Sequence, residues 1–130
     1  MTASDHALEI TRIAAQAASD KLGQDLIAYD VSERLAITDV FLLVTAKNER
    51  QVSAVVDGVE EALLRAGEKP LRREGDREAR WVLLDYLDAV VHVQHAEERS
   101  LYALERLWRD CPTIELHVDE KVGAQAFDEA

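Results

Sequence analysis

Two short runs of β-branched and aromatic residues constrain this chain more than any other feature. They span residues 81–86 and 89–94, and only two residues separate them. Such spacing predicts a β-hairpin. With a two-residue loop, Leu83 lies opposite His92, and this pairing fixes which side chains share each face of the hairpin.

The two faces of the predicted hairpin differ in composition. The first face is apolar and is typical of a core; it holds Val82, Leu84, Tyr86, Ala89, Val91 and Val93. The second face mixes aromatic, charged and amide groups, which is typical of a binding surface; it holds Trp81, Leu83, Asp85, Val90, His92 and Gln94. An alternative remains open, in which Trp81 and His92 complete a second small core under a loop.

Hydrophobic periodicity predicts the other elements. An alanine-rich amphipathic helix is expected over residues 4–22, and strands over 26–31 and 40–45. Asn48 resembles an N-cap, with Gln51 three residues later, and a second helix follows until Gly67.

After that helix, residues 71–80 form a minor basic island with the character of a solvated loop. A third helix is expected over residues 96–108, with Leu101, Leu104 and Trp108 turned inward. Residues 114–118 alternate and suit a short last strand. The order predicts an α/β fold with a single mixed β-sheet and helices packed on its core face.

A chain of 130 residues suits one domain. We expect an α/β domain over residues 1–118 and an acidic, mobile tail over 119–130. No segment has the length of a membrane span or the pattern of a secretory signal, which predicts a cytoplasmic protein without membrane contact. The one cysteine, Cys111, forms no internal disulfide and is expected to be buried and inert.

The net charge of -11 argues against a broad grip on a nucleic-acid backbone and favours a basic partner surface. Two function classes follow from the residues. The first is a binding module that docks on a macromolecule through the face with Trp81 and His92. The second is a small nucleotidyltransferase-like enzyme that uses Asp85 and Asp88 to hold a metal.

The hypothesis of an enzyme has little support in the sequence. Asp85 and Asp88 fall on opposite faces in the predicted register, and Asp is common in turns. His92 and His95 would diverge on a strand, so we expect no metal site. The chain has five glycines and no phosphate-binding loop, and we expect no cofactor.

Several motifs in fixed order resemble the ribosomal silencing factor family, also called Iojap-related proteins. The resemblance extends over about residues 7–112. It rests on residues 38–44 (TDVFLLV), 49–52 (ERQV), 74–75 (EG), 81–86 (WVLLDY), 88–93 (DAVVHV) and 102–108 (YALERLW).

The resemblance implies a non-enzymatic factor that binds the large ribosomal subunit at its fourteenth protein. It would sterically block association with the small subunit and so repress translation. It also implies a homodimer of the free protein and leaves room for a minor ribosomal RNA contact. The fold would have nucleotidyltransferase-like topology without the catalytic signature, because residues 45–48 (TAKN) stand where a Gly-Ser loop would be needed.

The resemblance also implies a docking surface. Carried over by position, it would consist of Arg80, Trp81, Asp85, Tyr86, His92, Tyr102 and Glu105. Tyr86 is the one conflict with this set, because it faces the core in the predicted register; a bulge or loop there would resolve it. The sequence departs from the family pattern at Leu87, where Gly is usual and Leu makes a tight turn costly, and at Gln94, where an aromatic residue is frequent.

Overall fold

The computed structural model describes residues 2–75 and 80–119, apart from the side chain of Tyr102. Its elements are α1 (Asp5–Asp20), β1 (Gln24–Asp30), β2 (Val40–Ala46), α2 (Glu49–Arg65), β3 (Arg72–Gly75), β4 (Trp81–Asp85), β5 (Ala89–His95), α3 (Ala96–Tyr102) and α4 (Leu104–Trp108).

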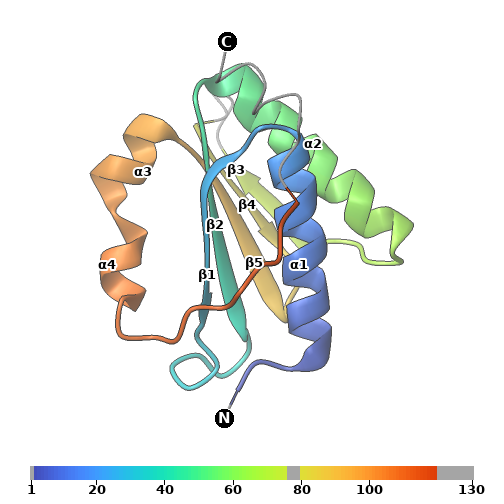
Figure 1. Ribbon diagram of the computed structural model, residues 1–130, viewed down its shortest axis with the longest axis vertical. Coiled ribbons are helices and arrows are strands. Elements are labelled where there is room, and N and C mark those ends of the chain that lie inside the picture. Colours follow the sequence, from blue (N-terminus) through green and yellow to red (C-terminus); the bar gives the residue numbers. More distant parts are fainter. Residues whose placement is uncertain (1, 76–79, 120–130) are drawn as a thin grey trace.

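The strands form one five-stranded mixed sheet in the order β1-β2-β5-β4-β3 (Figure 1). β2 and β5 run parallel, and every other neighbouring pair is antiparallel. The predicted mixed α/β sheet is therefore confirmed. So is the hairpin register, since Leu83 pairs with His92.

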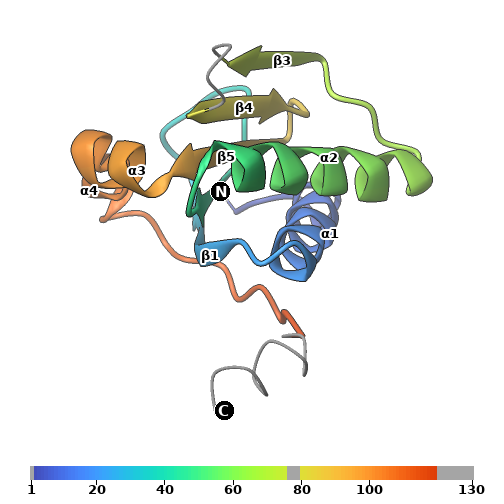
Figure 2. The same ribbon diagram turned by 90° about the horizontal axis from the view of Figure 1, so that it is seen from above.

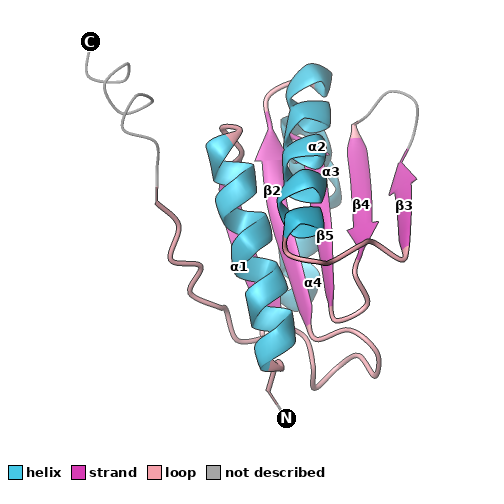
Figure 3. Cartoon of the chain, turned by 90° about the vertical axis from the view of Figure 1, so that its right-hand side faces the viewer, coloured by secondary structure: helices cyan, strands magenta, loops and turns pink. Residues whose placement is uncertain are grey.

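Helices α1 and α2 pack side by side on one face of the sheet (Figure 3). Both start at a side-chain cap: Ser4 Oγ accepts from Ala7 N at 3.1 Å, and Asn48 Oδ1 accepts from Gln51 N at 2.8 Å. All six residues of the predicted core face of the hairpin are buried beneath these helices. The apolar alternation thus predicted this core correctly.

Helices α3 and α4 lie on the opposite face of the sheet (Figure 2). Beneath them is a second apolar cluster of Tyr29, Val31, Leu43 and Cys111, with Phe41, Leu104 and Trp108 packed against it. The prediction of helices on the core face alone was therefore incomplete. Helices therefore lie on both faces of the sheet, but on this second face they cover only the part that contains the second cluster.

The third predicted helix is broken in two. Ala103 adopts a left-handed backbone (φ 45°, ψ 51°) between α3 and α4. This break rotates α3, so Leu101 is 74% exposed instead of facing inward. Leu104 and Trp108 do pack inward, as predicted.

Two further predictions were wrong. Residues 72–75 are not a loop but the edge strand β3, paired with β4. Residues 114–118 form no strand; Ile114 N donates to Ala28 O, and Ile114, Leu116 and Val118 pack against the main core. Residues 76–79, within the basic island, and 120–130, within the predicted tail, lie outside the described residues.

Candidate functional site: an open strip on β4 and β3

Within residues 2–75 and 80–119, no helix lies over the part of the second sheet face formed by β4 and β3. There Trp81, Leu83 and Asp85 of β4 are half-buried, and Arg72 and Glu74 of β3 are exposed. The register pairs Arg72 with Asp85 and Glu74 with Leu83, so all five side chains share one face. We call these five residues the open strip. It combines an indole, an aliphatic group and charges of both signs, a composition that suits a protein interface.

Both carboxylate oxygens of Asp85 have a partner. Its Oδ1 accepts from Leu87 N at 2.8 Å, and its Oδ2 lies 3.4 Å from Nε of Arg72. Asp88 is committed elsewhere, because its Oδ2 lies 2.7 Å from Nδ1 of His6. The two carboxylates thus contact different partners. Among residues 2–75 and 80–119, no group of three or more His, Cys, Asp or Glu side chains could hold a metal ion.

Arg80 borders the strip and joins three helical carboxylates. Its Nε donates to Glu98, its Nη1 to Glu49 and its Nη2 to Glu97, each at 2.9 Å. The hydrogen bonds that Arg80 donates to Glu98 and Glu97 raise its pKa. Arg80 therefore links the start of β4 to the first turns of α2 and α3.

His92 belongs to the predicted binding face but is buried, with 6% of its surface exposed. Its ring packs edge to face on Phe41, with 5.2 Å between the two ring centroids. Burial lowers the pKa of His92 to about 4. Val90 and Gln94 on the same face are buried as well. The alternative of a second small core thus holds for His92, while Trp81 stays half-exposed.

Tyr86 is the clearest correction to the carried-over surface. It is 5% exposed and lies in the main core, as the hairpin register predicted, and the turn that begins after Asp85 does not direct it outward. Burial raises its pKa to about 12. Tyr86 therefore lies on the wrong side of the sheet to contact a partner at the open strip.

Tyr102 and Glu105 are the last two residues of the docking surface that the family resemblance implies, and they lie in α3 and α4. The side chain of Tyr102 is outside what the structure describes. Glu105 is half-buried and accepts from Nε of Arg99 at 2.8 Å, while Nη1 of Arg99 donates to Thr45 Oγ1 at 2.9 Å. Glu105 thus holds α4 against α3 and the sheet.

Sequence reasoning missed Arg72 and Glu74 as site residues. Their strand reads as a loop because Arg, Glu and Gly are weak strand formers. The alternation of charge between Arg72 and Glu74, which places both on one face of an extended chain, was the available signal.

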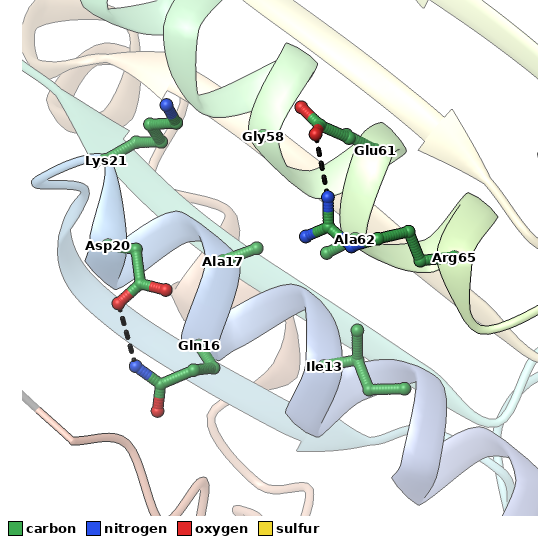
Figure 4. Close-up of a pocket in the computed structure, with 9 residues that line it drawn as sticks. All are labelled: Ile13, Gln16, Ala17, Asp20, Lys21, Gly58, Glu61, Ala62 and Arg65. Atoms are coloured by element: carbon green, nitrogen blue, oxygen red, sulfur yellow. Dashed lines mark hydrogen bonds and ion pairs between the residues drawn. The ribbon is translucent and has the colours of Figure 1, made fainter.

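A groove on the far side of the molecule runs between α1 and α2 (Figure 4). Two of its polar contacts lie within single helices: Gln16 donates to Asp20 at 3.0 Å, and Arg65 donates to Glu61 at 2.7 Å. Gln16 also donates to Asp119 O and accepts from Asp119 N, each at 2.9 Å. The two contacts within helices are surface contacts between neighbouring turns. They do not converge on a common point, so this groove lacks the arrangement of a catalytic site.

Comparison with known proteins identifies the family. The model of the family described as "Ribosomal silencing factor during starvation" matches residues 4–130. The chain belongs to the ribosomal silencing factor family. The description of this family is one of ribosome regulation.

Individual relatives agree. The chain is 40% identical to ribosomal silencing factor RsfS of Bacillus subtilis over 107 residues, which cover 82% of this chain and 91% of that protein. It is 31% identical to the chloroplastic protein Iojap of Zea mays over 108 residues, covering 81% of this chain and 46% of that protein.

Solved structures show the same fold. A crystal structure from Chromobacterium violaceum superposes with a TM-score of 0.75 at 32% identity, covering 88% of this chain and 94% of that one. Another crystal structure, from Bacillus halodurans, gives a TM-score of 0.73 at 37% identity, covering 83% of this chain and 98% of that one.

No helix within the described part of the chain is long and apolar enough to cross a membrane.

Proposed function

We propose that this silencing factor binds the large ribosomal subunit at its fourteenth protein through the open strip, and that the bound protein sterically blocks association with the small subunit. Translation is thereby repressed. The free protein forms a homodimer, and contact with ribosomal RNA is minor.

The half-exposed Trp81 is the observation that carries this proposal. A Trp ring that is only partly covered can bury much further area at low entropy cost, and such residues are frequent anchors of interfaces. Trp81 lies on a strand that is paired on both sides, so its backbone is already fixed before binding. Leu83 beside it adds apolar area, and Asp85 and Arg72 supply polar contacts.

The charge of the protein fits the same partner. A net charge of -11 repels bare phosphate backbone and attracts a basic protein surface. Long-range attraction of this kind raises association rates and weakens with salt. Binding should therefore slow as ionic strength rises.

Co-sedimentation with separated ribosomal subunits tests the proposal. The protein should pellet with large subunits and not with small ones. Light scattering should show slower subunit joining at saturating protein. Sedimentation with small subunits alone, or an unchanged joining rate, would contradict the proposal.

A matched pair of variants locates the surface. Leu83→Ala removes apolar area from the open strip and should weaken binding. Leu64→Ala removes the same side chain from an exposed site on α2, on the other side of the sheet, and should leave binding unchanged. Equal effects of the two variants would show that the strip is not the docking surface.

A further inference from the structure

The segment Ala96–Trp108 contains α3 and α4, and it has weaker stabilising interactions than the rest of the fold. α3 has seven residues and α4 has five, lengths at which an isolated helix is unstable in water. Ala103 between them occupies a left-handed backbone region that is costly for a residue with a Cβ. Leu101 and Leu107 face solvent at 74% and 62% exposure, so much of the apolar content of this segment contributes nothing to its packing.

The sheet surface near this segment contains buried polar atoms without partners. Gln94 is fully buried, and neither its amide nitrogen nor its amide oxygen has a hydrogen-bond partner among the described residues. Within the same described part of the chain, Nε2 of His92 also lacks a partner. Buried polar groups normally are paired, and each unpaired one opposes the closed arrangement.

The contacts that hold the segment down are mostly polar. Arg99 donates to Thr45, which is the register neighbour of Gln94 on β2, and Arg80 donates to Glu97 and Glu98. The apolar attachments are Leu104 and Trp108, and the ring centroid of Trp108 lies 5.1 Å from that of Phe41 in an edge-to-face contact. The pair of Arg80 with Glu97 is exposed and contributes little, so resistance to opening rests mainly on the largely buried Arg99 and on these two apolar side chains.

From these observations we infer that the segment Ala96–Trp108 lifts from the sheet as a unit while the sheet, α1 and α2 stay folded. Opening hydrates Gln94 and His92 and uncovers Phe41, which β5 separates from the open strip. The opening is a property of the free protein. Its consequence for docking, an enlarged surface that includes His92, rests on the proposed function.

Cys111 is a built-in reporter of the opening. It is the one cysteine of the chain, is 8% exposed, and lies in the cluster beneath α4 that includes Leu104 and Trp108. Labelling with dithionitrobenzoate under native conditions should proceed at least tenfold faster than the global unfolding equilibrium allows. Its rate should be nearly independent of low urea concentrations, because local opening exposes little surface. A labelling rate with the full urea dependence of global unfolding would overturn the inference.

Three variants separate local opening from other causes. Gln94→Leu removes the unpaired amide and should slow labelling several-fold. Arg99→Met breaks the bonds to Thr45 and Glu105 and should speed labelling several-fold. Leu87→Gly, in the distant hairpin turn, is expected to raise global stability and should leave the labelling rate unchanged. If Leu87→Gly slows labelling as much as Gln94→Leu does, Cys111 is reached by global unfolding.

Hydrogen exchange provides a second readout that does not depend on the thiol. Backbone amides of α3 and α4 should exchange together and earlier than those of β5 and α2. Equal protection of α3, α4 and β5 would overturn the inference. Both measurements use the free protein, so failed ribosome binding would not affect them, and their failure would leave the proposed function standing.

Discussion

The indole Nε1 of Trp81 donates a hydrogen bond of 3.2 Å to Nδ1 of His92. Because Nδ1 accepts this bond, the proton of the neutral imidazole resides on Nε2. The bond joins a half-exposed residue of the open strip to a buried residue of the layer beneath. Trp81 is therefore positioned by His92, which supports its ring from behind.

This relationship predicts different defects for two adjacent aromatic positions. Trp81→Ala should weaken large-subunit binding by about 2 kcal/mol, or roughly thirtyfold in affinity, with a moderate loss of melting temperature because Nδ1 of His92 loses its donor. His92→Ala leaves a cavity beside Phe41 and should cost on the order of 2 kcal/mol of folding stability. Thermal melts and co-sedimentation of both variants check this. A Trp81→Ala protein that melts far below wild type would show that the ring is part of the core.

His92 should also make the protein sensitive to mild acid. Its folded-state pKa of about 4 lies below the unfolded value of about 6.5, so the unfolded state binds the proton more readily. The neutral ring contributes stability above pH 6.5, and this contribution is lost as the pH falls toward 4. Urea denaturation between pH 4 and 7 measures the effect. In His92→Gln this pH dependence should be smaller than in wild type, and identical slopes would exclude the burial argument.

The elements with strict periodicity were predictable from sequence. The β4–β5 register followed from the alternation of Val82 and Leu84 with polar neighbours and from the two-residue loop. The burial of Tyr86 followed from the same register, and it held against the position implied by family resemblance. The hairpin register and the burial of Tyr86 depend on local geometry, and the alternation of apolar and polar residues encodes that geometry.

The burial of residues on the second face of the sheet was not predictable in the same way. Nothing around Ala103 indicates a break, because left-handed residues are usually Gly or Asn. Without that break, α3 and α4 could not be placed over His92 and Gln94, so both seemed available for binding. The edge strand β3 was missed because its residues gain stability from pairing with β4, a tertiary effect that outweighs their weak strand propensity.

A second histidine should produce the opposite pH dependence. The ring nitrogens of His6 lie 2.7 Å from Asp88 and 3.0 Å from Glu68, and the hydrogen bonds to Glu68 and Asp88 raise its pKa to about 9. Since this is above the unfolded value, the charged ring stabilises the fold fully below pH 6.5, and the contribution is lost as the pH rises through 9.

The size of the His6 effect is limited by solvent. Half of the side chain is exposed, so about 1 kcal/mol or less is expected, decreasing with salt. Denaturation between pH 6.5 and 9.5 should show stability falling in wild type and a flatter profile in His6→Gln. A wild-type profile that rises over this range would contradict the assignment.

The hairpin turn offers a stabilising change. Leu87 has φ 72°, a left-handed conformation that costs a residue with a Cβ roughly 1–2 kcal/mol, while Gly adopts it freely. The turn stays closed because Asp88 N donates to Tyr86 O and Tyr86 N donates to Ala89 O, each at 2.9 Å. Leu87→Gly should raise stability by about 0.5–1 kcal/mol, because greater freedom in the unfolded chain offsets part of the gain. Leu87→Ala retains the Cβ and should give no gain. Urea midpoints of the two variants decide the matter: equal midpoints would mean that the backbone at Leu87 is not strained, and a loss in Leu87→Gly would mean that its half-exposed side chain contributes more than its conformation costs.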